Sequence, residues 1–126
     1  MKSWLNLSLI TAFSLLAVHE MDAVTHAEWR LLPGLSQIAD ETARGIFVWL
    51  HIPLYIGALW ALFLASWRRI AGRVFSVAMI AHAFAHFVLS GDELYTFMPP
   101  IETVTVYGAA LAGAVYLTLS LKGISE

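Results

Sequence analysis

Four long apolar stretches dominate this chain and restrict it to a few architectures. They cover residues 4–24, 45–67, 74–90 and 101–121, and each has about the 20 residues that a helix needs to cross a hydrocarbon core of roughly 30 Å. Helices are also the simplest way to pair every backbone N–H and C=O inside lipid. We therefore predict an all-α polytopic membrane protein, with one domain over residues 1–126 and four transmembrane helices in an up-down bundle.

The composition favours the same class of protein. Of the 126 residues, 60% are hydrophobic and only 13% are charged, which is about half the charged fraction of an average soluble domain. A soluble core of this size cannot enclose so much apolar surface, so the lipid bilayer is a predicted partner. The net charge of -2 gives no basic surface for nucleic acid. The absence of cysteine excludes disulfides and thiolate metal sites.

The basic residues predict the orientation, because cytoplasmic connections collect Lys and Arg. If all four segments span, Arg30 and Arg44 lie on the outer side and five other basic residues on the inner side. Both termini are then cytoplasmic, and the expected location is the inner (plasma) membrane of a bacterial cell, crossed several times. A possible cleavage site ending at Ala23 has Met21 where a small residue is usual. We therefore expect the first helix to be retained.

Histidines from three predicted helices fall at one depth. With a rise of about 1.5 Å per residue, His19, His51, His82 and His86 lie in a layer roughly 5 to 15 Å below the outer surface. Ionisable groups inside a membrane are costly, and they usually face the bundle interior, paired with one another, with main chain or with an ion. The shared depth therefore indicates a common site.

Helical spacing adds carboxylates to two of these faces. His19, Asp22 and His26 align on the first helix, because residues three, four and seven apart share one face. Glu93 joins the two histidines of the third helix if that helix continues through Gly91. Imidazole and carboxylate together suit Zn²⁺ or non-haem iron.

We therefore predict a divalent metal site near the outer face. The expected ligands are His19, Asp22, His82 and His86. Four further side chains are expected to be alternative ligands or to hydrogen-bond to the ligands: Glu20, His26, His51 and Glu93. With iron bound, a membrane oxidoreductase acting on a lipid-soluble substrate is one interpretation, and whether the protein is an enzyme stays open.

Three alternatives remain open from the sequence. Histidines from two helices are also the axial ligands of a haem-binding electron carrier. Histidines that titrate near neutral pH are typical of a proton or cation pathway. The third alternative is a structural accessory subunit, in which His51 and His26 are packing or head-group residues.

Two other patterns predict structure rather than chemistry. Gly108, Ala112 and Gly113 belong to a small-residue stripe in the fourth helix, which permits close packing within the bundle or against a second copy or another membrane protein. Aromatic residues near the helix ends predict membrane-interface anchors, and these are Trp4, Trp29, Trp49, Trp67 and Tyr95.

Two sequence elements carry a family resemblance. The run His-Glu-Met-Asp-Ala (19–23), followed by Glu-Trp-Arg (28–30), resembles an uncharacterised family of small four-helix bacterial membrane proteins. The chain is more distantly similar to membrane proteins named for a His-x-x-Glu-Glu motif, although it has Asp22 at the first acidic position and Ala23 at the second, so the pair of acids is missing. Neither resemblance implies a reaction. Together they single out His19, Glu20, Asp22, Glu28 and Arg30.

Overall fold

The computed structural model describes residues 2–122, and all regular elements in that range are helical. The elements are α1 (Lys2–Thr25), η1 (Glu28–Arg30), η2 (Leu35–Gln37), α2 (Asp40–Leu59), η3 (Trp60–Leu64), α3 (Arg68–Leu89), α4 (Pro99–Glu102), η4 (Thr103–Tyr107) and α5 (Gly108–Leu121). The short elements η1 and η2 are 3₁₀ turns, whereas η3 and η4 are π-helical stretches that continue α2 and α4. The other five residues of the predicted domain, 1 and 123–126, lie outside the described part.

Four helical spans are long and apolar enough to cross a membrane, as predicted. They cover Trp4–Thr25, Asp40–Leu64, Arg68–Leu89 and Pro99–Leu121. The second span begins five residues earlier than expected and ends three earlier, because Asp40 and Glu41 occupy its first turn, where acids complement the helix dipole. The third begins six residues earlier, with Arg68 and Arg69 inside it. Polar helix ends of this kind extend beyond the apolar stretches that sequence reasoning detects.

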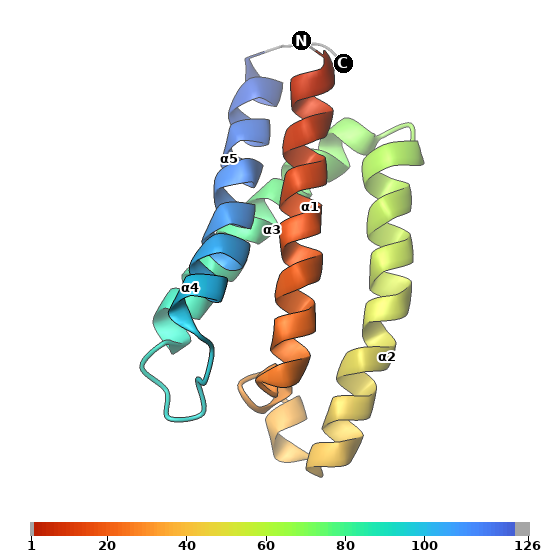
Figure 1. Cartoon of the computed structure of the whole chain (residues 1–126). Coiled ribbons are helices and arrows are strands. Elements are labelled where there is room, and N and C mark those ends of the chain that lie inside the picture. The colour runs from red at the N-terminus through yellow and green to blue at the C-terminus, as the bar shows by residue number, and fades with distance from the viewer. Residues whose placement is uncertain (1, 123–126) are drawn as a thin grey trace.

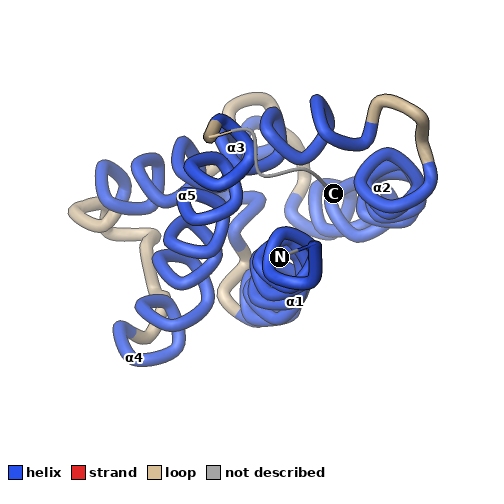
Figure 2. The backbone as a smooth tube through the Cα atoms, turned by 90° about the horizontal axis from the view of Figure 1, so that it is seen from above, coloured by secondary structure: helices blue, strands red, loops and turns tan. Residues whose placement is uncertain are grey.

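The spans run alternately up and down, and the start of α1 and the end of α5 lie at the same end of the bundle (Figure 1). The most extensive packing joins α5 to α3 and α1 to α5. Seen from above, α2 stands at the edge beside α1 (Figure 2), and only 11% of its most apolar window is buried. We call the end that carries the α1–α2 and α3–α4 connections the distal end.

Two apolar clusters hold the bundle together, one near each end. At the end near the termini, Leu5, Leu9 and Tyr116 are almost fully buried. At the distal end, Trp29 and Phe97 belong to a second cluster. The distal cluster borders the buried histidines, because Phe97 stacks on His19 with ring centroids 5.5 Å apart. The predicted anchors Trp29 and Tyr95 therefore pack inward: Trp29 is only 4% exposed.

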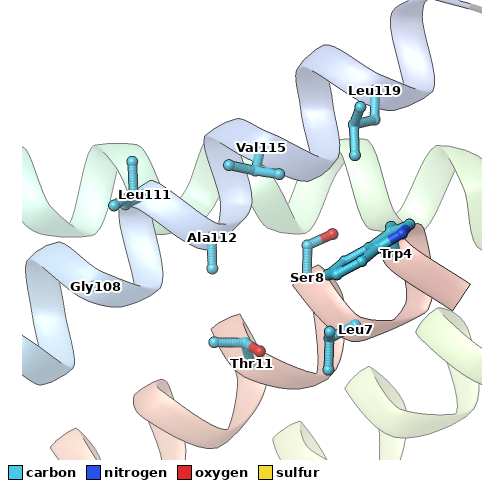
Figure 3. Close-up of a pocket in the computed structure, with 9 residues that line it drawn as sticks. All are labelled: Trp4, Leu7, Ser8, Thr11, Gly108, Leu111, Ala112, Val115 and Leu119. Carbon is cyan, nitrogen blue, oxygen red and sulfur yellow. The ribbon is translucent and has the colours of Figure 1, made fainter.

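The small-residue stripe divides between two neighbouring helices. A Cβ on Gly113 would lie 3.2 Å from the Cα of Ser76, so this glycine lets α5 approach α3 closely. Gly108 and Ala112 instead line an apolar groove of about 460 Å³ between α5 and α1, opposite Ser8 and Thr11 (Figure 3). At Gly113 the predicted close approach takes place within the chain.

Gly72→Ala is expected to destabilise the bundle. A Cβ at Gly72 would lie 2.6 Å from Cε1 of Tyr116 and closer still to its Cζ and Oη, and Tyr116 has no exposed surface into which to move. Overpacking of this kind costs about 1–3 kcal/mol. Thermal unfolding in detergent measures it, and Gly57→Ala, whose Cβ meets nothing within 4 Å, is the control. Equal melting temperatures for the two variants would contradict the packing described here.

Candidate functional site

Three histidines and one glutamate converge in the distal half of the bundle. His19 comes from α1, His82 and His86 from α3, and Glu28 from η1. One nitrogen or oxygen atom from each of these residues lies within 4.8 Å of the others. His19 is fully buried, and His86 and Glu28 are buried at 3% and 8% exposure. We call this group the His/Glu cluster.

The imidazole rings of the cluster pack directly on one another. The centroid of His19 lies 5.0 Å from that of His82 and 4.6 Å from that of His86, and both pairs are close to perpendicular. His82 and His86 follow one another by one helical turn, with centroids 4.7 Å apart. The spacing of four along α3 therefore presents both rings to the same point on α1, as the sequence predicted.

Glu28 reaches the cluster because the chain reverses immediately before it. Ala27 has φ of 54° and ψ of 45°, a left-handed conformation that non-glycine residues seldom adopt. The single turn η1 follows at once and carries Glu28 back towards the end of α1. Residues held in such conformations often occur at functional sites, where surrounding contacts compensate their cost.

Contacts made by the next two residues hold this reversal in place. Trp29 donates from Nε1 to Oδ1 of Asp40 at 2.9 Å. Arg30 donates to both oxygens of the same carboxylate, at 2.7 and 2.8 Å. The bidentate pair raises the pKa of Arg30 above its usual value. The Glu-Trp-Arg element therefore has two roles: its last two residues fasten η1 to the start of α2, and its first points into the bundle.

The carboxylate of Glu28 lies between two imidazoles. Its Oε2 is 3.4 Å from Nε2 of His19, and its Oε1 is 3.7 Å from Nε2 of His86. Burial acts to raise the pKa of Glu28, but the interactions with His19 and His86 outweigh it and lower the pKa to about 2. Glu28 is therefore an anion in the site at neutral pH.

A second layer of polar contacts fixes the orientation of His86. The hydroxyl of Tyr95 donates a hydrogen bond to Oε1 of Glu102, and Nδ1 of His86 lies 2.7 Å from the same hydroxyl. Because the hydroxyl has one proton and gives it to Glu102, Nδ1–H of His86 must be the donor in the second bond. The other ring nitrogen of His86, Nε2, faces Glu28. Burial and the bond to Glu102 also raise the pKa of Tyr95, so that it keeps its proton.

The other predicted site residues lie outside the His/Glu cluster. Asp22 instead pairs with His26, whose Nε2 is 3.4 Å from Oδ1 of Asp22 and whose Nδ1 is 3.1 Å from Oγ1 of Thr96. Glu93 is exposed, because α3 ends at Leu89 and does not continue through Gly91.

Glu20 and His51 form a separate pair between α1 and α2. Nε2 of His51 lies 2.9 Å from Oε2 of Glu20. The nearly 100° between successive helical residues carries Glu20 to a different face of α1 from that of His19. The structure thus distributes the five histidines over three sites rather than one.

The chemistry of the cluster fits a metal ion. Both ring nitrogens of His19, Nε2 of His82 and Oε2 of Glu28 are buried without a hydrogen-bond partner among the described residues. Leaving such atoms without hydrogen bonds in an apolar interior is costly, and one ion bound between the four residues would engage one nitrogen of each imidazole and one carboxylate oxygen. Tetrahedral ligands at roughly 2.0 Å from Zn²⁺ lie about 3.3 Å apart, so limited side-chain movement closes the group around an ion.

Sequence reasoning did not assign Glu28, Tyr95 or Glu102 to this site, although the family resemblance singled out Glu28. Glu28 was visible as the first residue of the Glu-Trp-Arg element, but a helical projection cannot anticipate the reversal at Ala27. Tyr95 lies in the α3–α4 connection, where no periodicity indicates the direction of a side chain. Glu102 lies at the start of the fourth span, and the sequence does not tell which neighbouring helix that part of the span faces.

Comparison with known proteins gives a family and no activity. No curated protein and no solved structure matches the chain. One family model does, over residues 5–123, which include every residue of the His/Glu cluster. The chain therefore belongs to this family, a family of unknown function (DUF6713).

Proposed function

We propose that the protein is a membrane metalloprotein in which His19, Glu28, His82 and His86 bind one Zn²⁺ or non-haem iron ion. The observation that carries the proposal is the mutual approach of their four ligand atoms to within 4.8 Å. Glu28 replaces Asp22 in the ligand set predicted from the sequence, because Glu28 belongs to the group of converging ligand atoms and Asp22 does not.

The ligand types limit the identity of the ion. Three imidazoles and a carboxylate complete the four-coordinate shell that structural Zn²⁺ sites use. Iron(II) takes up to six ligands, so the same set would leave positions open for a substrate or for oxygen, as an oxidoreductase requires. Tyr95 hydrogen-bonds to Nδ1 of His86, and Glu102 hydrogen-bonds to Tyr95. A hydrogen bond to the nitrogen that does not bind the metal is the usual way in which a metal-bound histidine is oriented.

The packing of the cluster favours a bare ion over haem. A haem bound by two histidines stands between their rings, but the rings of His19 and His86 are in contact, with centroids 4.6 Å apart. Phe97 stacks on the ring of His19 and packs edge-on against the ring of His86. A porphyrin would have to separate α1 from α3, whereas an ion requires only small rotations of the side chains.

The proposed location follows from the positive-inside argument. Arg68, Arg69 and Arg73 lie at the end of the bundle near the termini, where cytoplasmic residues are expected. Two of them donate to the carbonyl oxygen of Ser120 near the end of α5, Arg69 at 3.0 Å and Arg73 at 2.8 Å. The His/Glu cluster at the distal end then lies on the outer side of a bacterial inner membrane.

Elemental analysis and an absorption spectrum of the same detergent-purified sample test the proposal. We expect about one equivalent of zinc or iron per chain, with no Soret band. The double variant His82→Ala/His86→Ala should retain less than a tenth of this metal. Protein that is folded but metal-free would exclude the proposal and favour a proton pathway or a structural role for the histidines.

A further inference from the structure

The Glu20–His51 pair lines a second cavity, away from the His/Glu cluster. The cavity has a volume of about 290 Å³ and lies between α1 and α2. Its polar lining comes from Glu20, His51 and Tyr55, and its other walls are apolar. Both members of the pair are largely buried, with side-chain exposures of 15% and 20%. The residues that line the cavity belong to two membrane-spanning segments, so an apolar ligand dissolved in the bilayer has better access to it than a charged ligand from water.

The hydrogen bonds of His51 fix the chemistry that the cavity offers. Nδ1 of His51 lies 2.6 Å from the carbonyl oxygen of Phe47, which can only accept, so this nitrogen is a donor. Nε2 then faces Oε2 of Glu20 at 2.9 Å, with one proton between the two atoms. Both ring nitrogens of His51 thus have a hydrogen-bond partner. The second carboxylate oxygen of Glu20 has no hydrogen-bond partner among the residues described.

Aromatic rings form one wall of the cavity. The ring of Tyr55 packs edge-on against His51, with centroids 5.6 Å apart, and against Phe13 at the same distance. This packing holds the Tyr55 side chain in the cavity wall beside Glu20. The cavity is therefore lined by the carboxylate of Glu20 and by the side chains of His51 and Tyr55.

The cavity opens towards lipid. Met21 and Val48 line the cavity and are 73% and 42% exposed. Because both residues belong to membrane-spanning segments, their exposed surfaces face the bilayer. The cavity is at the lower end of the usual volumes for small-molecule sites, which suits one ring whose apolar substituent extends into the bilayer.

We propose that this cavity binds the head group of a lipid-soluble phenol, a class that includes hydroquinones. The phenolic hydroxyl donates to the second oxygen of Glu20 and accepts from the hydroxyl of Tyr55, while the ring packs against His51 and Tyr55. The proposal does not depend on a metal in the His/Glu cluster.

Equilibrium dialysis with 4-butylphenol tests this site. The protein is incorporated into lipid nanodiscs, and binding is compared with that of protein-free nanodiscs. We expect one saturable site per chain. The matched probe 4-butylanisole has the same ring but no hydroxyl proton, and it should bind at least tenfold more weakly, since loss of the hydrogen bond would leave the oxygen of Glu20 without a partner, which costs about that factor.

Conservative variants locate the binding. Tyr55→Phe and Glu20→Gln should each weaken the binding of 4-butylphenol about tenfold, because each alters one hydrogen-bonding group without changing the shape of the cavity. Tyr107→Phe, which removes a hydroxyl from the fourth span outside the cavity, should bind like the wild type. Metal content, measured on the same samples, should be unchanged in Tyr55→Phe. Equal uptake of phenol and anisole, or equal uptake by all variants and by empty nanodiscs, would overturn the proposal.

Discussion

Glu28→Gln is expected to lower the bound metal at least tenfold, whereas Asp22→Asn is expected to retain it. Glu28 supplies the only carboxylate of the His/Glu cluster, and a neutral amide is a much weaker ligand for Zn²⁺ or iron than an anionic oxygen. Asp22 instead faces His26 at 3.4 Å. Metal content of the purified variants, measured by elemental analysis, decides between the two acids.

This pair of variants tests whether Glu28, which the structure places in the cluster, or Asp22, which helical spacing predicted, is the carboxylate ligand. Both substitutions replace a carboxylate with the amide of the same shape, so a general effect of lost charge would affect both. Loss of metal in Asp22→Asn together with retention in Glu28→Gln would restore the ligand set expected from the sequence.

Tyr95→Phe is expected to weaken metal binding by about 10- to 100-fold, the usual effect of removing a group that orients a metal-bound histidine. The hydroxyl of Tyr95 is the partner of Nδ1 of His86 and of Oε1 of Glu102. Without it, Nδ1 of His86 loses its partner at 2.7 Å, and the ring must turn to reach Oε1 of Glu102, which lies 3.6 Å away.

A competition titration with a chelator of known affinity measures this loss. The melting temperature of the metal-free protein is recorded beside it, because a purely structural role of Tyr95 would lower that temperature and leave the metal affinity unchanged. Tyr55→Phe, in the other cavity, is the matched control and should bind metal like the wild type. An affinity of Tyr95→Phe within twofold of the wild type would show that the hydroxyl does not position His86.

The main features of the fold were predictable because they depend on local sequence. Apolar length alone indicates four spans, and Pro99 and Pro100 mark the start of the fourth, where α4 begins. The convergence of His19, His82 and His86 was also accessible. Depth in the membrane follows from helical rise, and the spacing of four puts both α3 histidines on one face.

Which acid completes the cluster depends on the backbone geometry of the connection between α1 and α2. Asp22 lies on the predicted face of α1, yet Glu28 enters the cluster, because Ala27 turns the chain back and Asp40 holds the turn through Trp29 and Arg30. No helical periodicity extends through such a reversal. The sequence by itself therefore determined the four spans and the histidine layer, since both follow from local pattern. Only the tertiary structure decided which acid completes the cluster and that Glu20 and His51 form a site of their own, because both depend on how separate helices and connections meet in space.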